Sequence, residues 1–149
     1  MIDPIKPHPP GGSETSGRIT EWEQQMPTDI NIIYVEDEPN IAELVSNGLK
    51  LFGIEVNPIY SSAEELLEQC STSHLDRADM FFFDIRLPRM TGLELAARLR
   101  ELGEKRPFIM VSAWPSPSKQ KLQELGALFL PKPFSFPDMV QTIHYLAQR

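Results

Sequence analysis

From Ile30 onward, short runs of strand-forming residues alternate with amphipathic segments. This alternation is typical of a parallel β-sheet covered by helices, because each parallel strand needs a crossover segment to reach the next. We predict strands at Ile30–Val35, Ile54–Tyr60, Met80–Phe83, Phe108–Ser112 and Ala127–Leu130. Three of these runs are apolar on both faces, as strands buried inside a parallel sheet are. Residues 30–149 are therefore predicted to form one α/β domain of five strand–helix units.

Apolar residues at helical spacing mark the segments between the strands. The first helix is predicted to bury Ile41, Leu44, Val45 and Leu49, and the second Ala63, Leu66, Leu67 and Cys70. The buried side of the last helix carries Phe136, Met139, Val140, Ile143 and Leu146. Its outward side presents Gln141, Thr142, His144, Tyr145 and Gln148. This outward side lacks the alternating charges that favour pairing between helices.

Residues 1–29 differ in composition from the rest of the chain, with five prolines and three glycines. We interpret them as a flexible arm or linker, with an extension foreign to the domain as the alternative. Within this arm, Thr20 and Glu23 have the spacing of a capping box, and Trp22 could anchor a helical turn against the domain. The segment up to Met26 is too short to form a stable helix alone.

Composition excludes several functional classes. The chain has one cysteine, so it has no disulfide framework and no CxxC pair, and a cytoplasmic location is expected. No apolar run approaches the length of a membrane helix. The net charge of −7 lacks the basic footprint that binding to a phosphate backbone requires. We therefore expect neither membrane insertion nor direct binding to nucleic acid.

Polar side chains follow four of the five predicted strands. Glu36 and Asp37 come after the first strand and Asp84 after the third, Ser112 ends the fourth, and Lys132 lies just beyond the fifth. Right-handed crossovers bring the carboxyl ends of parallel strands to one edge of the sheet, where ligands of such sheets bind. A cluster of carboxylates repels itself unless a cation intervenes, and oxygen ligands favour Mg²⁺. With a lysine and a hydroxyl beside it, this cluster suits a phosphoryl group.

Each of these residues also has a structural interpretation. Glu36 and Asp37 could cap the helix that begins near Pro39, and Lys132 could be an ordinary solvated amine. Asp84 is harder to explain in this way, because the next predicted helix has its own capping residue in Thr91. Agreement among four strand ends favours the functional interpretation over the structural one.

At these positions the sequence resembles the receiver domains of bacterial two-component response regulators. The matching segments are Val35-Glu36-Asp37-Glu38, Asp84-Ile85-Arg86-Leu87-Pro88 with Gly92, Ser112-Ala113 and Lys132-Pro133-Phe134. The resemblance runs from about Ile30 to Arg149. It implies a flavodoxin-like, doubly wound (βα)5 fold, with a five-stranded parallel sheet in the order 2-1-3-4-5.

The resemblance also implies roles for individual residues. Asp84 would be the phosphoacceptor, and Glu36, Asp37 and Asp84 would form the Mg²⁺ pocket together with the backbone carbonyl of Arg86. Glu36 would act mainly through a water on the ion. Ser112 and Lys132 would hold phosphoryl oxygens, and the Lys132-Pro133 peptide bond would be cis.

Three further positions correspond to places where the family controls switching and phosphoryl lifetime. Phe129 lies at the position of the rotating aromatic residue, where tyrosine is common, so that burial alone must drive any rotation. Arg86 and Trp114 lie two residues after Asp84 and Ser112, respectively. Because both are large, they should hinder the in-line water that hydrolyses an aspartyl phosphate.

These features predict a signalling receiver, not an enzyme in the usual sense. It would take a phosphoryl group from a sensor histidine kinase or a histidine phosphotransfer protein, and act on an unknown partner through the fourth helix, the fifth strand and the fifth helix. The sequence ends after the predicted fifth helix, so we expect any output to lie elsewhere. An aspartate-nucleophile phosphatase and a flavodoxin-like cofactor carrier are the alternatives. The first would need a second aspartate at Arg86, and the second a phosphate-binding loop in place of Glu36 to Glu38.

Overall fold

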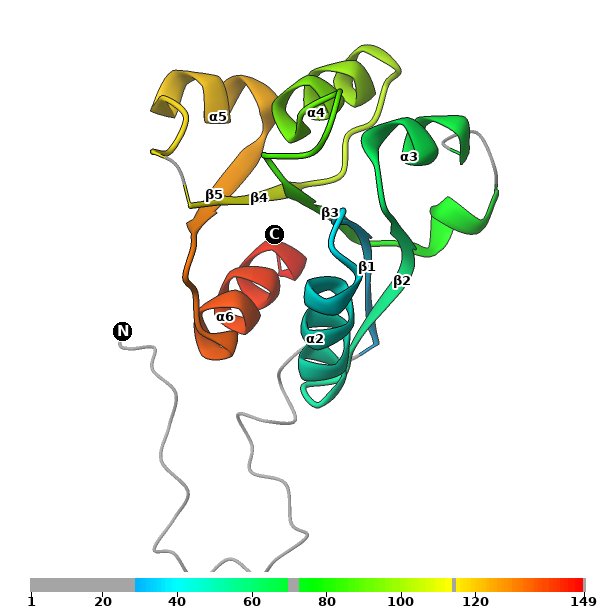
Figure 1. Cartoon of the computed structure of the whole chain (residues 1–149), viewed down its shortest axis with the longest axis vertical. Coiled ribbons are helices and arrows are strands. Elements are labelled where there is room, and N and C mark those ends of the chain that lie inside the picture. The colour runs from blue at the N-terminus through cyan, green and yellow to red at the C-terminus, as the bar shows by residue number, and fades with distance from the viewer. Residues whose placement is uncertain (1–28, 70–72, 114, 149) are drawn as a thin grey trace, which may run out of the picture.

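The computed structural model describes residues 29–69, 73–113 and 115–148 (Figure 1). Its strands are β1 (Ile30–Val35), β2 (Ile54–Tyr60), β3 (Met80–Asp84), β4 (Phe108–Ser112) and β5 (Ala127–Pro131). Its helices are α2 (Pro39–Lys50), α3 (Ala63–Gln69), α4 (Gly92–Glu101), α5 (Lys119–Leu125) and α6 (Phe136–Ala147), with a 3-10 helix at Ser73–Arg77. The predicted arm up to residue 28, Cys70 and Trp114 lie outside the described residues.

The five strands form one parallel sheet in the order β2-β1-β3-β4-β5, as predicted. Figure 1 shows α2 and α6 on one face of the sheet and α3, α4 and α5 on the other. β3 and β4 are buried along their whole length, because both strands lie inside the sheet with helices on each side. The strand order reverses between β1 and β3, which is where such sheets bind their ligands.

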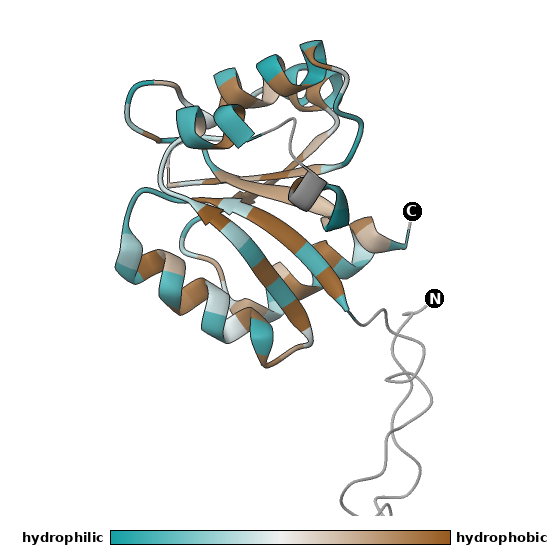
Figure 2. Cartoon of the chain, turned by 90° about the vertical axis from the view of Figure 1, so that its right-hand side faces the viewer, coloured by the Kyte–Doolittle hydropathy of each residue, from teal (hydrophilic) through white to brown (hydrophobic). Residues whose placement is uncertain are grey.

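Two hydrophobic cores hold the layers together. Ile32, Tyr34 and Phe82 belong to the core beneath α2 and α6, while Ile33, Phe81 and Phe83 belong to the core beneath α3, α4 and α5. Neighbouring residues divide between the two cores because successive side chains of a strand point to opposite faces. In Figure 2 the helices carry both hydrophilic and hydrophobic residues, whereas much of the sheet is hydrophobic. In the described ranges, no helix has the length and apolar character needed to span a membrane.

The helix ends follow from local sequence. Thr91 accepts a hydrogen bond from the backbone N–H of Glu94, and the Glu94 carboxylate accepts one from the backbone N–H of Thr91, which completes the predicted capping box of α4. Gly126 ends α5 in the left-handed conformation, as its position after the helix predicts. The start of α4 fixes the path of the segment that follows β3, and the end of α5 fixes the path of the segment that precedes β5.

Four details differ from the prediction. β3 and β5 each extend one residue further, because Asp84 pairs with Val111 and Pro131 with Ser112 in the strand ladders. Leu44 is 63% exposed, since the buried face of α2 is formed instead by Ala42, Val45 and Leu49. His144 is buried, because its position on α6 adjoins the buried residues Val140 and Ile143. The outward face predicted for the last helix is therefore wrong at His144.

Candidate functional site

The carboxyl ends of four strands lie level with one another. The ladder pairs Val35 with Phe83 and Ser112 with Pro131, so the residues that follow β1 and β5 emerge at the same edge as the ends of β3 and β4. The backbone N–H of Lys132 donates to the carbonyl of Ser112 at 2.9 Å and fixes the path of the chain beyond β5. The predicted site residues are therefore brought together by the sheet itself.

Three carboxylates form an acidic cluster at this edge. One oxygen from each of Glu36, Asp37 and Asp84 lies within 4.8 Å of the others. Glu36 is only 3% exposed and Asp84 only 5%, whereas Asp37 is open to solvent. Buried carboxylates this close together are unfavourable without positive charge nearby. The donor set is all oxygen, and the cluster therefore suits a hard divalent cation such as Mg²⁺.

Lys132 supplies positive charge to Asp84. Its Nζ lies 2.9 Å from Oδ2 of Asp84. The other oxygen, Oδ1, accepts a hydrogen bond from the backbone N–H of Arg86 at 3.0 Å. Each Asp84 oxygen thus has a donor, which holds the carboxylate in one orientation at the mouth of the site.

Glu36 is held from two sides. Its Oε1 accepts a hydrogen bond from the hydroxyl of Tyr34 at 3.3 Å, and its Oε2 accepts one from the backbone N–H of Glu38 at 3.2 Å. Burial, together with the negative charge of Asp84, raises the pKa of Glu36 from 4.5 to about 7. Burial and the adjoining Glu36 carboxylate also raise the pKa of the Tyr34 hydroxyl. Tyr34 therefore remains a proton donor to Glu36 near neutral pH.

A cavity of about 260 Å³ opens over these groups. It is lined by Glu36, Asp37, Glu38, Ile41, Asp84, Arg86, Ser112, Ala113 and Lys132. The lining combines negative charge at one side with an ammonium group and a hydroxyl at the other. This combination fits a cation and a phosphoryl group held together.

The structural interpretation of the acidic residues receives little support. The N-terminal cap of α2 is Glu38, whose side chain makes no capping hydrogen bond. Thr91 caps α4, so Asp84 is not needed for that role.

The start of α4 packs closely against Asp84, since a Cβ atom added to Gly92 would lie 2.5 Å from the Asp84 backbone oxygen. Gly92 thus allows α4 to start directly against the end of β3.

The remaining predicted residues lie around this centre. Ser112 is buried, Arg86 is exposed at the cavity wall, and half-buried Phe129 packs against the core beneath α4 and α5. The Lys132–Pro133 peptide bond is cis, as the family resemblance implies. Trp114 lies outside the described residues. Sequence reasoning missed Tyr34, although its place two residues before Glu36, on the same face of the strand, could have revealed it.

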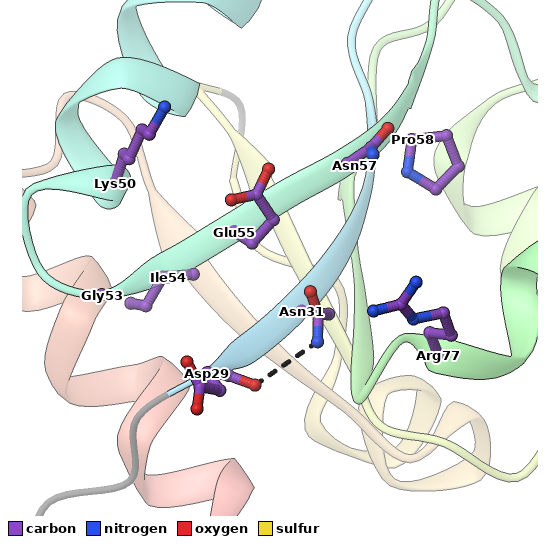
Figure 3. A pocket seen from close by; sticks show the side chains of 9 residues that line it. All are labelled: Asp29, Asn31, Lys50, Gly53, Ile54, Glu55, Asn57, Pro58 and Arg77. Carbon is purple, nitrogen blue, oxygen red and sulfur yellow. Dashed lines mark hydrogen bonds between the residues drawn. The ribbon is translucent and has the colours of Figure 1, made fainter.

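A larger cavity lies elsewhere in the described part of the chain. It has a volume of about 820 Å³ and lies near the amino ends of β1 and β2, opposite the edge that carries the acidic cluster (Figure 3). Its lining mixes Asp29 and Glu55 with Lys50 and Arg77, so charges of both signs face the same space. The three carboxylates that lie close enough together to share a cation, Glu36, Asp37 and Asp84, line the smaller cavity, which is therefore the candidate site.

Comparison with known proteins gives the family of sequences that this chain resembles. The family model described as "response regulator receiver domain" matches residues 32–144. Response regulator MprA of Mycobacterium leprae is 30% identical over 122 residues, which are 80% of this chain and 52% of that protein. The chain thus spans about half the length of the curated relatives it matches.

Solved structures share the fold. The Vibrio cholerae chemotaxis protein CheY4 is 27% identical with a TM-score of 0.68, over 78% of this chain and 98% of that one. A second similar chain comes from the co-crystal structure of the Saccharomyces cerevisiae histidine phosphotransfer signaling protein Ypd1 with the receiver domain of its downstream response regulator Ssk1. It has 19% identity and a TM-score of 0.67, and covers 83% of this chain and 91% of that one. The sheet order and helix layers described above are therefore those of a flavodoxin-like receiver fold.

Proposed function

Because this chain belongs to the response regulator receiver domain family, we propose that it accepts a phosphoryl group on Asp84 from a phosphohistidine donor. The observation that carries this proposal is the position of Asp84, which is buried at the end of β3 among Glu36, Asp37 and Lys132. In the transfer, an Asp84 carboxylate oxygen forms a bond to phosphorus as the bond from phosphorus to the donor imidazole nitrogen breaks. The imidazole leaves with the electron pair of that bond.

Mg²⁺ would be held by Asp37 and Asp84, with the backbone carbonyl of Arg86 as a further ligand and Glu36 completing the acidic pocket. When bound, the ion neutralises charge on the phosphoryl oxygens. Asp37 is exposed and Asp84 is buried, so the pocket is open to solvent at Asp37 and enclosed by protein at Asp84. The buried cluster of carboxylates supports this assignment, because a cation relieves its repulsion.

Lys132 and Ser112 would hold the phosphoryl oxygens. The Lys132 ammonium group donates a hydrogen bond to Asp84 Oδ2, and it can donate to a phosphoryl oxygen once that carboxylate is phosphorylated. Ser112 lies at the end of the neighbouring strand and lines the same cavity. Movement of Ser112 toward the phosphoryl group would leave space that Phe129 could fill. This rotation would shift the population between two conformations of the protein that differ in surface.

Arg86 and Trp114 would lengthen the life of the phosphorylated state. Arg86 stands at the cavity wall, where its bulk hinders a water in line with the phosphoryl bond. We expect faster loss of phosphate in Arg86→Ala and in Trp114→Ala, followed after removal of the donor in the presence of Mg²⁺. Unchanged decay in both variants would remove the basis for this role.

The donor would be a sensor histidine kinase or a histidine phosphotransfer protein. The yeast receiver domain of similar fold was crystallised with such a phosphotransfer protein. We place the surface that changes for a downstream partner on α5, β5 and α6, because Phe129 lies on β5 two residues before Pro131, which pairs with Ser112 of the site. Chemical shifts of this face should change when beryllofluoride is added, and shifts that stay fixed while those near Asp84 move would refute the coupling.

Receiver domains are signalling domains and not classical enzymes, and the alternative functions are not favoured by these relatives. A phosphatase of the aspartate-nucleophile class carries a second aspartate where this chain has exposed Arg86. A flavodoxin-like carrier needs a neutral phosphate-binding loop after β1, where this chain has Glu36, Asp37 and Glu38. A steady-state phosphatase assay separates the first alternative, with no turnover expected.

Mass spectrometry of the intact chain tests the phosphoacceptor. Incubation with acetyl phosphate and Mg²⁺ should add the mass of one phosphoryl group, and a chelator should prevent the gain. Asp84→Asn should abolish it, whereas the matched variant Asp76→Asn, at an exposed aspartate of the 3-10 helix, should retain it. A gain that persists in Asp84→Asn would place the phosphoryl group on another residue.

A further inference from the structure

Large apolar side chains are exposed along α2 and the turn that follows it. Leu51 is 86% exposed, Leu44 63% and Phe52 47%. Positions 44, 48 and 51 share one face of a helix, since they are four and three residues apart. We call Leu44, Leu51 and Phe52 the α2 stripe. Each of them leaves apolar area in water that a partner segment could cover.

The α2 stripe continues onto α6. A Cβ atom on Gly48 would collide with the ring of Phe136, so this ring lies over the glycine between Leu44 and Leu51. Phe136 is only partly buried and belongs to the edge of the core beneath α2 and α6. The exposed leucines therefore flank a ring instead of standing as isolated side chains.

Elsewhere in the described ranges, exposed large apolar residues do not gather in this way. Ile59 lies on β2, Leu102 follows α4 and Tyr145 lies on α6. Single exposed apolar residues are normal in soluble proteins, whereas a contiguous group marks a surface that contacts something. The α2 stripe is such a group.

The chain that precedes β1 starts beside this surface. Ile30 pairs with Ile54, which comes two residues after Phe52. Figure 3 shows Asp29, Gly53 and Ile54 at the same end of β1 and β2. From Asp29, the extended steps through Thr28 and Pro27 to Met26 span about 10 Å. A helix from Met26 back to Ile19 spans about 10 Å, which equals the separation of roughly 10 Å between Leu44 and Leu51 along α2. Residues near Trp22 can therefore reach the whole stripe.

The sequence of that preceding segment has the pattern of a short amphipathic helix. Ile19, Trp22 and Met26 are spaced as i, i+3 and i+7, which places them on one face of a helix. Thr20 and Glu23 have the spacing of a capping box, and Pro27 stops a helix after Met26. A helix this short is stable only when it packs on an apolar surface. Amphipathic helices bind such surfaces through apolar side chains at this spacing.

We propose that residues 19–26 pack as an amphipathic helical turn on the α2 stripe of the same chain. Trp22 and Met26 contact Leu51 and Phe52, and Ile19 lies toward Leu44. Because the segment is tethered at Asp29, its effective concentration is in the millimolar range, and a weak contact is enough to keep it in place. This inference is independent of phosphorylation at Asp84.

Fluorescence of the full chain tests the proposal. The chain has two tryptophans, so Trp114→Phe leaves Trp22 as the only one. We expect Trp22 emission at shorter wavelength than that of free N-acetyltryptophanamide, together with weaker quenching by acrylamide. Adding Leu51→Glu should return both properties to the free values, because a carboxylate on the stripe repels an apolar anchor.

A matched variant and a second substitution make the result decisive. Leu102→Glu changes another exposed leucine, 56% exposed at the end of α4 on the opposite face of the sheet, and should leave Trp22 emission unchanged. Leu44→Glu should act in the same direction as Leu51→Glu, and circular dichroism should show that both variants fold. Trp22 emission equal to the free value in the parent, or unaffected by Leu51→Glu, would overturn the proposal. Emission that depends on protein concentration would show that a second copy covers the stripe, which also overturns it.

Discussion

Ionisation of Glu36 should destabilise the folded protein when no cation is bound. Its pKa rises from 4.5 to about 7, because of burial and the nearby charge of Asp84. The folded chain thus holds this proton to higher pH than the unfolded chain does. Stability from this group is fully present below pH 4.5 and is lost as the pH rises through about 7. Since one pKa unit is worth about 1.4 kcal/mol, the full loss is roughly 3 kcal/mol.

Replacing Glu36 by Gln removes this titration. Glu36→Gln should raise the free energy of unfolding relative to the parent, and the gain should be about 2 kcal/mol larger near pH 8.5 than near pH 5.5. Comparing two pH values cancels the effect of the altered hydrogen bonds to Tyr34 and Glu38, which is the same at both. Urea unfolding followed by circular dichroism in the presence of a chelator measures the difference.

Two controls separate this explanation from a general effect of losing charge. Burial raises the pKa of Glu104, but hydrogen bonds from Arg106 outweigh it and lower the pKa overall. Glu104→Gln should therefore destabilise the protein near neutral pH. Replacing the chelator by Mg²⁺ should reduce or reverse the gain from Glu36→Gln, because an ion that binds only the folded chain stabilises it. An equal effect of Glu36→Gln at both pH values would refute the reasoning.

Three further predictions follow from single contacts. Gly92→Ala should destabilise the protein by about 1–3 kcal/mol in urea unfolding, because its Cβ atom would lie 2.5 Å from the backbone oxygen of Asp84 and 2.9 Å from Cα of Ile85. An unchanged urea midpoint of unfolding would show that α4 shifts freely. Burial lowers the pKa of His144, so stability from its neutral form is lost as the pH falls below the ordinary value of 6.5. The His144→Leu variant should therefore lose less stability than the parent on acidification, as measured by thermal melting. Equal losses in the two proteins would contradict this. Lys132→Met should tighten Mg²⁺ binding in calorimetry, because it removes an ammonium group 2.9 Å from Asp84 Oδ2, and weaker binding would show that Lys132 orders the pocket instead.

The strands were predictable because they depend on patterns that are local in sequence, whereas their order in the sheet was implied by the family resemblance. The five apolar runs predict the strands, and parallel pairing then places Glu36, Asp84 and Lys132 at one edge without further information. The strand ends moved by one residue, since ladder hydrogen bonds continue past the last apolar side chain at Asp84 and Pro131. The meeting of the three carboxylates with Lys132 at one edge of the sheet was therefore predictable.

Other features depend on which neighbours meet in space. Leu44 was predicted to be buried from helical spacing alone, but the contact between Gly48 and Phe136 brings α6 against α2 without covering it. His144 was predicted to face outward because of its polarity, yet it adjoins Val140 and Ile143 on the buried face. The bond from Tyr34 to Glu36 depends on side-chain orientation, which hydropathy patterns do not contain.

The central claim is that Asp84 carries the phosphoryl group, and reductive trapping tests it at the level of the residue. Borohydride reduces an aspartyl phosphate to homoserine with release of phosphate, so the modified position is recorded permanently. The chain is treated with acetyl phosphate and Mg²⁺, reduced, cleaved, and sequenced by mass spectrometry. We predict homoserine at position 84 and unmodified aspartate at position 37. Homoserine at position 37, or none at position 84 in a chain that has gained a phosphoryl group, would contradict the assignment.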